Sequence, residues 1–211
     1  LALDANTTAD DNTAVGTAAL GANTTGTQNT ALGFEAMKFG TTGSSNTALG
    51  ACTLGGSDVN TGDNNVAIGR KSMFDNTSGA SNVGVGISSL ESNTTGAINT
   101  STGSFSLACN TTGNDNTANG GFAMKENTTG SNNVAMGRSA LRCNTTASGN
   151  TAVGKDSLKL NTTGASNTAV GQLSLDANTT GENNVAMGSS ALGSNTDGDG
   201  NTAVGASALA T

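Results

Sequence analysis

A unit of 17 residues repeats along almost the whole chain, and it limits the fold more than any other feature. A pentapeptide related to Asn-Thr/Val-Ala-apolar-Gly begins at Asn12 and returns eleven more times, the last time at Asn201. Every step is 17 residues except the one from Asn46 to Asn65, which is 19, with two extra residues near 55–58. A period this short, rich in Gly and Thr, predicts an all-β parallel solenoid with one coil per repeat and no helical repeat. We expect 1–211 to be a single segment of about twelve coils, uncapped at both ends.

Each place in the unit has an expected role, which the copy beginning at Asn65 illustrates. Side chains alternate along a strand, so Val66 and Ile68, at the second and fourth places, share one face, which we predict to point inward. Gly69, at the fifth place, is Gly in all twelve copies and predicts a corner with positive φ. The ninth place, which is Met73 in this copy, is Leu or Met in all twelve copies, and we predict that it is buried. The copy with Asn133, Gly137 and Leu141 repeats the arrangement.

The segment Asn-Thr-Thr-Gly, which closes most units, has the composition of a turn, because Asn and Gly tolerate left-handed backbone conformations. In a solenoid, its copies would place Asn above Asn. All eight basic residues fall at the sixth, seventh or tenth places, which we therefore expect to face solvent.

The chain contains no His, Pro, Trp or Tyr, and only 2% of its residues are aromatic. One coil supplies about two large apolar side chains, which is little to fill a solenoid. We therefore expect much of the stability to come from repeated backbone hydrogen bonds, and a homotrimer to complete the core.

The net charge of −7 argues against binding to nucleic acid. No apolar run approaches the roughly 20 residues that span a bilayer, so we expect no membrane insertion of this segment.

A Ser or Cys nucleophile has no His to act as its base, and the carboxylates are scattered, so the sequence predicts no catalytic, cofactor-binding or metal-binding residue and no enzyme activity. We interpret Cys52, Cys109 and Cys143 as incidental small residues. The run from Asp197 to Asn201 is interpreted as a polar turn and not a calcium loop.

Two consecutive coils depart from the pattern. Phe105 and Phe122 occupy the seventh place, where we expect them to stack as an exposed aromatic pair near Arg138 of the next coil. These three residues are the candidate surface for a ligand or a partner. The apolar fourth place becomes Thr102 and Asn119 in the same coils, and in a trimer a ring of Asn119 side chains would hold water or an ion.

The pentapeptides at 65–69 and 133–137 resemble the V-A-I-G signature in the head domains of trimeric autotransporter adhesins, the YadA-like left-handed parallel β-roll. The longer unit at 167–181 resembles repeats of bacterial and phage tail-fibre proteins. The resemblance implies an extracellular homotrimeric fibre, on a cell or virion surface, that attaches to a host-surface protein or glycan. The adhesin repeat is shorter, so the additional residues here lengthen a turn.

Two other functions remain open. An ice-binding solenoid needs an outward row of Thr-x-Thr, and the expected inward direction of the second place argues against it. A self-assembling filament, in which copies stack end to end, would use the uncapped ends instead.

Overall fold

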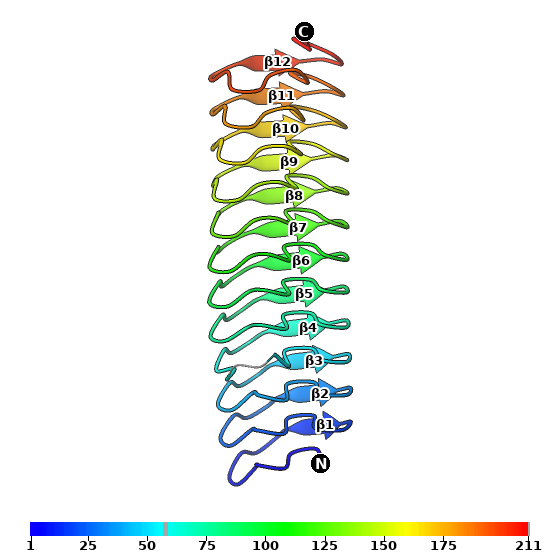
Figure 1. Cartoon of the computed structure of the whole chain (residues 1–211), viewed down its shortest axis with the longest axis vertical. Coiled ribbons are helices and arrows are strands. Elements are labelled where there is room, and N and C mark those ends of the chain that lie inside the picture. Colours follow the sequence, from blue (N-terminus) through cyan, green and yellow to red (C-terminus); the bar gives the residue numbers. More distant parts are fainter. Residues whose placement is uncertain (57–58, 211) are drawn as a thin grey trace.

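The computed structural model describes residues 1–56 and 59–210, and confirms an all-β parallel solenoid with coils of about 17 residues. Figure 1 shows a rod in which the strands lie above one another from the N-terminal end to the C-terminal end. Twelve three-residue strands form one sheet in sequence order: β1 Thr13–Val15, β2 Thr30–Leu32, β3 Thr47–Leu49, β4 Val66–Ile68, β5 Val83–Val85, β6 Thr100–Thr102, β7 Thr117–Asn119, β8 Val134–Met136, β9 Thr151–Val153, β10 Thr168–Val170, β11 Val185–Met187 and β12 Thr202–Val204. No helix among the described residues is long and apolar enough to cross a membrane.

The strands pair in parallel with the same place of the unit always opposite itself. Thr13 pairs with Thr30, and the pairing of Thr47 with Val66 keeps this register across the 19-residue coil. The extra residues are therefore taken up away from the sheet. Gly56 is buried there and donates its amide to the carbonyl of Phe74 at 2.8 Å, while positions 57 and 58 of the predicted insertion lie outside the described residues.

The predicted inward direction of the second and fourth places is wrong. The middle residue of each strand, usually Ala, points inward: Ala31, Ala135 and Ala169 have no exposed surface. Val66 and Ile68 lie on the opposite side of the strand and are only half-buried. The alternation was predicted correctly, but the faces were interchanged.

The reason for the inversion is the narrowness of the coil. The ninth-place residues of the first eleven units form an inner column that fills the interior on its own: Leu20, Met37, Leu54, Met73, Leu90, Leu107, Met124, Leu141, Leu158, Leu175 and Leu192, none more than 4% exposed. Leu209 of the last unit is 59% exposed. They pack in one cluster with the strand Ala residues and with Ala or Ser of the eighth place, and only small side chains fit opposite them. Large strand side chains must therefore point outward.

The corner predicted at the fifth place is confirmed. Gly137 follows β8 with a φ of 135°, which side chains rarely adopt. A Cβ atom on Gly137 would lie 2.6 Å from the carbonyl oxygen of Gly154 in the next coil. Both the conformation and the close stacking thus require glycine between the outward strand face and the inner column.

Left-handed backbone conformations were expected in the Asn-Thr-Thr-Gly segment, but they occur at other places of the unit. The seventh, ninth and seventeenth places have φ near 50–60°, as at Phe122 (62°), Leu141 (52°) and Asn132 (59°), whereas Gly130 of the Asn-Thr-Thr-Gly segment does not have positive φ. Hydrogen bonds between coils hold this costly conformation: Leu141 donates its amide to Ser157 at 2.9 Å, and Phe122 donates to Ser104 at 3.0 Å.

Stacked Asn residues brace the interior, as the repeat predicted. At the first place, Oδ1 of Asn133 accepts a hydrogen bond from the backbone N–H of Asn150 at 2.9 Å, and Nδ2 of Asn133 donates to the Ala147 carbonyl at 2.9 Å. At the twelfth place, Nδ2 of Asn127 donates to Oδ1 of Asn110 at 2.8 Å, and the series runs from residue 76 to 195. Each buried amide of the series thus finds a partner in a neighbouring coil.

Candidate interaction surface

The outward face of the sheet is uncharged along the whole rod and combines a row of Thr and Val with a mostly apolar row. Its second-place row consists of eight Thr and four Val residues. Its fourth-place residues form an outer column: Val15, Leu32, Leu49, Ile68, Val85, Thr102, Asn119, Met136, Val153, Val170, Met187 and Val204. Met136 is 46% exposed and Val15 is 56% exposed, although side chains of this kind are usually buried. We call these two rows the sheet face.

The sheet face carries no charged residue in any of its twelve strands. Strands 4.8 Å apart make it about 53 Å long, and the strands with one flanking residue at either side make it about 17 Å wide. The resulting strip covers about 900 Å², and its apolar part consists of ten outer-column residues and the four second-place Val residues. An area of this size and composition indicates an interaction surface.

The two edges of the sheet face carry charges of opposite sign. The charged residues at the sixth place, which follows the corner glycine, are all basic: Arg70, Arg138 and Lys155. The charged residues just before each strand, at the sixteenth and seventeenth places, are all acidic: Asp10, Asp11, Asp63, Asp115, Glu182 and Asp199. Each rod therefore has a positive and a negative edge on either side of an apolar strip.

Polar residues interrupt the outer column at one point only. Thr102 ends β6 and Asn119 ends β7, so the two side chains are neighbours in the sheet. Asn119 is exposed. The Thr102 hydroxyl oxygen is buried and has no hydrogen-bond partner within the chain. Thr102 was predicted to point inward and is half-buried on the outward side instead.

The aromatic pair predicted in the same coils is confirmed, and it lies beside this interruption. The rings of Phe105 and Phe122 stack with centroids 5.6 Å apart and planes 7° from parallel. Phe105 is 36% exposed and Phe122 is half-buried. Arg138 is exposed at the sixth place of the following coil, and no contact joins it to either ring in the described part of the chain. Gly121 leaves open space next to the pair, because a Cβ atom there would meet only the Ser104 carbonyl oxygen at 3.9 Å. Stacking leaves each ring a single uncovered face at most.

The side of the rod made by the seventh, tenth and eleventh places differs sharply from the sheet face. Ion pairs lie along it, including Lys38–Glu35 at 2.9 Å and Lys159–Asp156 at 3.5 Å. Lys38 also lies 5.0 Å from the centre of the Phe39 ring. Partly exposed pairs of this type add little stability, so this side is best described as a solvated surface.

The cysteines lie on this side without forming disulfides. Cys52, Cys109 and Cys143 are free and half-buried. Burial raises the pKa of the Cys143 thiol, and the nearby Glu126 carboxylate raises it further. A raised thiol pKa means less thiolate and low reactivity near neutral pH.

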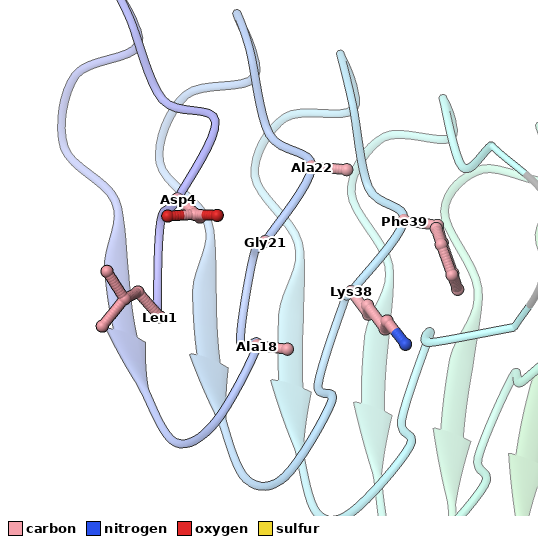
Figure 2. Close-up of a pocket in the computed structure, with 7 residues that line it drawn as sticks. All are labelled: Leu1, Asp4, Ala18, Gly21, Ala22, Lys38 and Phe39. Carbon is pink, nitrogen blue, oxygen red and sulfur yellow. The ribbon is translucent and has the colours of Figure 1, made fainter.

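A shallow pocket near the N-terminal end lies on the same side (Figure 2). The small residues Ala18, Gly21 and Ala22 form its floor, between Leu1 and Asp4 of one coil and Lys38 and Phe39 of another. The figure shows few polar groups converging on it. Among the described residues, no group of three or more His, Cys, Asp or Glu side chains is placed to hold a metal ion. In the Asp197–Asn201 run, Asp199 accepts the Glu182 amide at 2.7 Å, as a polar turn does.

Comparisons with known proteins give no relative from which to infer a function. No family model, no curated protein and no solved structure matches the chain.

Proposed function

We propose that this chain is a structural segment of an extracellular fibre on a cell or virion surface, a rigid rod that assembles as a homotrimer through its sheet face and displays an attachment surface. The observation that carries the proposal is the uncharged sheet face along all twelve strands. A soluble chain that exposes such a strip gains stability when copies of itself cover the strip.

The dimensions of the sheet face support a trimer. Each chain of a trimer would bury its strip of about 900 Å² against two neighbours, which is close to the total of about 800 Å² that each protein buries in a stable complex. Packed sheets lie about 10 Å apart, so each contributes side chains about 5 Å deep. Three strips at that depth around one axis close into a triangle with sides of about 17 Å, which matches the width of the strip with its flanking residues.

The charges at the edges favour copies that run in the same direction. In any ring of parallel rods, the edge with Arg70 and Lys155 meets the edge with Asp63 and Glu182 of the next copy. In an antiparallel pair, by contrast, like edges meet and repel. Parallel rods place all N-terminal ends together, as a fibre requires.

Light scattering over a dilution series tests the proposal. We expect a trimer whose mass does not change with concentration. The double variant Met136→Asp, Met187→Asp should convert it to folded monomers, because charges would have to be buried in the interface. The matched control is Thr129→Asp, Thr180→Asp, since these exposed turn positions correspond to Asp197 in another coil. A parent chain that is monomeric at all concentrations contradicts the assembly, and open-ended growth supports the end-to-end filament instead.

Ice binding is a second candidate, favoured by the outward direction of the second-place Thr residues. The argument against it assumed that these residues point inward, and that assumption is wrong: Thr13, Thr30 and Thr117 are exposed. The outward pattern is nevertheless Thr-x-Thr in only one of the twelve strands, β6, whereas the other strands carry an apolar residue, or in β7 an Asn, at the fourth place. Measuring ice growth in the presence of the parent chain, at concentrations where light scattering gives its mass, separates the candidates, because an ice-binding face must be free of partners.

A further inference from the structure

Repetition creates a problem for an interface built on the sheet face. Neighbouring strands have nearly the same outward residues, Thr or Val followed by an apolar residue. If one copy slides along the axis by a single coil, eleven of the twelve strands still face a matching strand. The apolar contacts alone therefore distinguish the aligned assembly only weakly from slipped ones.

The outer column contains a single feature that occurs once along the rod. Thr102 and Asn119 follow one another in consecutive strands, and every other member of the column is apolar. Alignment places the Asn119 residues of all copies at one height. An amide both donates and accepts hydrogen bonds, so these side chains can satisfy one another around the axis.

A slipped assembly loses this match. Asn119 would then face Met136 or Thr102 of another copy, and a polar group opposite an apolar side chain in a buried interface lacks partners. Thr102 adds to the effect, because its hydroxyl has no partner within the chain and would gain one by turning toward a neighbouring copy. A single polar residue in an apolar seam sets the register of coiled coils in the same way.

We propose that Thr102 and Asn119 fix the axial register of the assembled rods, a role that rests on the proposed homotrimer. The partner at this site is a second and a third copy of the same chain, each presenting its own Thr102 and Asn119. The two residues thus exchange some apolar contact for alignment.

Disulfide cross-linking reads the register directly. In a background with Cys52, Cys109 and Cys143 replaced by Ser, chains with Leu32→Cys are mixed with chains with Leu49→Cys, denatured, refolded together and oxidised. Disulfides form preferentially between the cysteines that lie nearest, so aligned rods favour 32–32 and 49–49 pairs, whereas a slip of one coil brings residue 49 to the height of residue 32 and favours 32–49 pairs. In the otherwise unchanged chain, we expect the like pairs to exceed the mixed pair by about tenfold or more.

The test variant is Thr102→Val, Asn119→Val, which gives both places the residue type of the remaining column. We expect it to remain a trimer, while mixed 32–49 pairs rise to a yield similar to that of the like pairs. A rescue variant adds Val153→Thr and Val170→Asn, which moves the polar pair three coils along, and should restore the excess of like pairs. The rescue separates a role in register from a general effect on stability.

The outcomes distinguish this inference from the proposal beneath it. If the test variant is a trimer with the same ratio of like to mixed pairs as the parent, the register proposal is wrong and the trimer stands. A failure of the rescue variant to restore the ratio, although it assembles, also contradicts it. A parent chain that is monomeric in light scattering overturns the trimer and the register proposal together.

Discussion

The inner and outer columns contain the same kind of side chain, one large apolar residue per coil, in opposite surroundings. Leu141 of the inner column is fully buried, whereas Met136, five residues earlier, is 46% exposed. The chain itself covers the inner column, whereas the described residues leave the outer column exposed or half-buried. Repeated apolar residues therefore stabilise two levels of structure here: the inner column stabilises the coil, and we propose that the outer column stabilises the assembly.

The largest difference in the free energy of unfolding should appear when one large side chain of each column is replaced by Ala. Leu141→Ala removes a fully buried side chain and should lower the free energy of unfolding by about 2–5 kcal/mol. In a Met187→Asp background that light scattering finds to be monomeric, Met136→Ala should change the free energy of unfolding by no more than about 0.5 kcal/mol. Urea unfolding followed by circular dichroism measures both. Equal losses for the two variants would mean that the columns are not separate in function.

Substitution of the corner glycine, which lies between the two columns, should lower the stability nearly as much. Gly137→Ala places a Cβ atom 2.6 Å from a backbone oxygen at a φ of 135°, and we expect a loss of about 2–4 kcal/mol. Gly121→Ala is the matched control, because that glycine has open space and should tolerate the change within about 0.5 kcal/mol. Thermal melting of the two variants, each compared with the parent chain, measures both losses of stability. A tolerated Gly137→Ala would contradict the close stacking of the corners.

A smaller effect is expected on the second-place row of the sheet face. Thr151→Val together with Thr168→Val reproduces the residue found in four other strands, so the stability should change by no more than about 0.5 kcal/mol and the trimer should persist. The same variant sharpens the comparison with ice binding, which depends on the hydroxyl groups. A marked loss of ice-growth inhibition with unchanged mass would support that alternative.

The smallest effect concerns the solvated side of the rod. Because burial, followed by the Glu126 carboxylate, raises the Cys143 pKa, less thiolate is present at pH 8, and alkylation by iodoacetamide should be slower than in the denatured chain. Glu126→Gln removes the second cause only and should accelerate the reaction by less than about threefold. Mass spectrometry of the Cys143 peptide over time measures both rates. A native rate equal to the denatured one would contradict the pKa shift.

The sequence predicted which residues share a face, the coil length, the corner glycines and the stacked Asn residues, because each of these follows from local spacing. The direction of each face does not follow from spacing. The pattern Val-Ala-Ile at 66–68 is compatible with either face pointing inward. Which face does so depends on Leu and Met of the ninth place, which fill the interior from across the coil.

The left-handed conformations were missed for a related reason. Leu141 and Phe122 are residue types that seldom adopt positive φ, and no local signal marks them. Only the hydrogen bonds to the coils above and below hold them there, and those bonds exist once the repeats are stacked. Phe105, Phe122, Thr102 and Asn119 were recognisable as departures from the repeat, but the separation of the two rings at the seventh place from the two polar residues on the sheet face depended on the fold.

The 19-residue coil shows where the rod accepts additional chain. Asn46 and Asn65 remain hydrogen-bonded through side chain and backbone at 2.8 Å, and the strands on either side stay in register. The twelfth-place Asn series, by contrast, is absent at Gly40 and resumes at Asn76. The region after the ninth place is thus a site where the coil accepts additional residues: a peptide inserted there would leave the register of the strands and the sheet face unchanged.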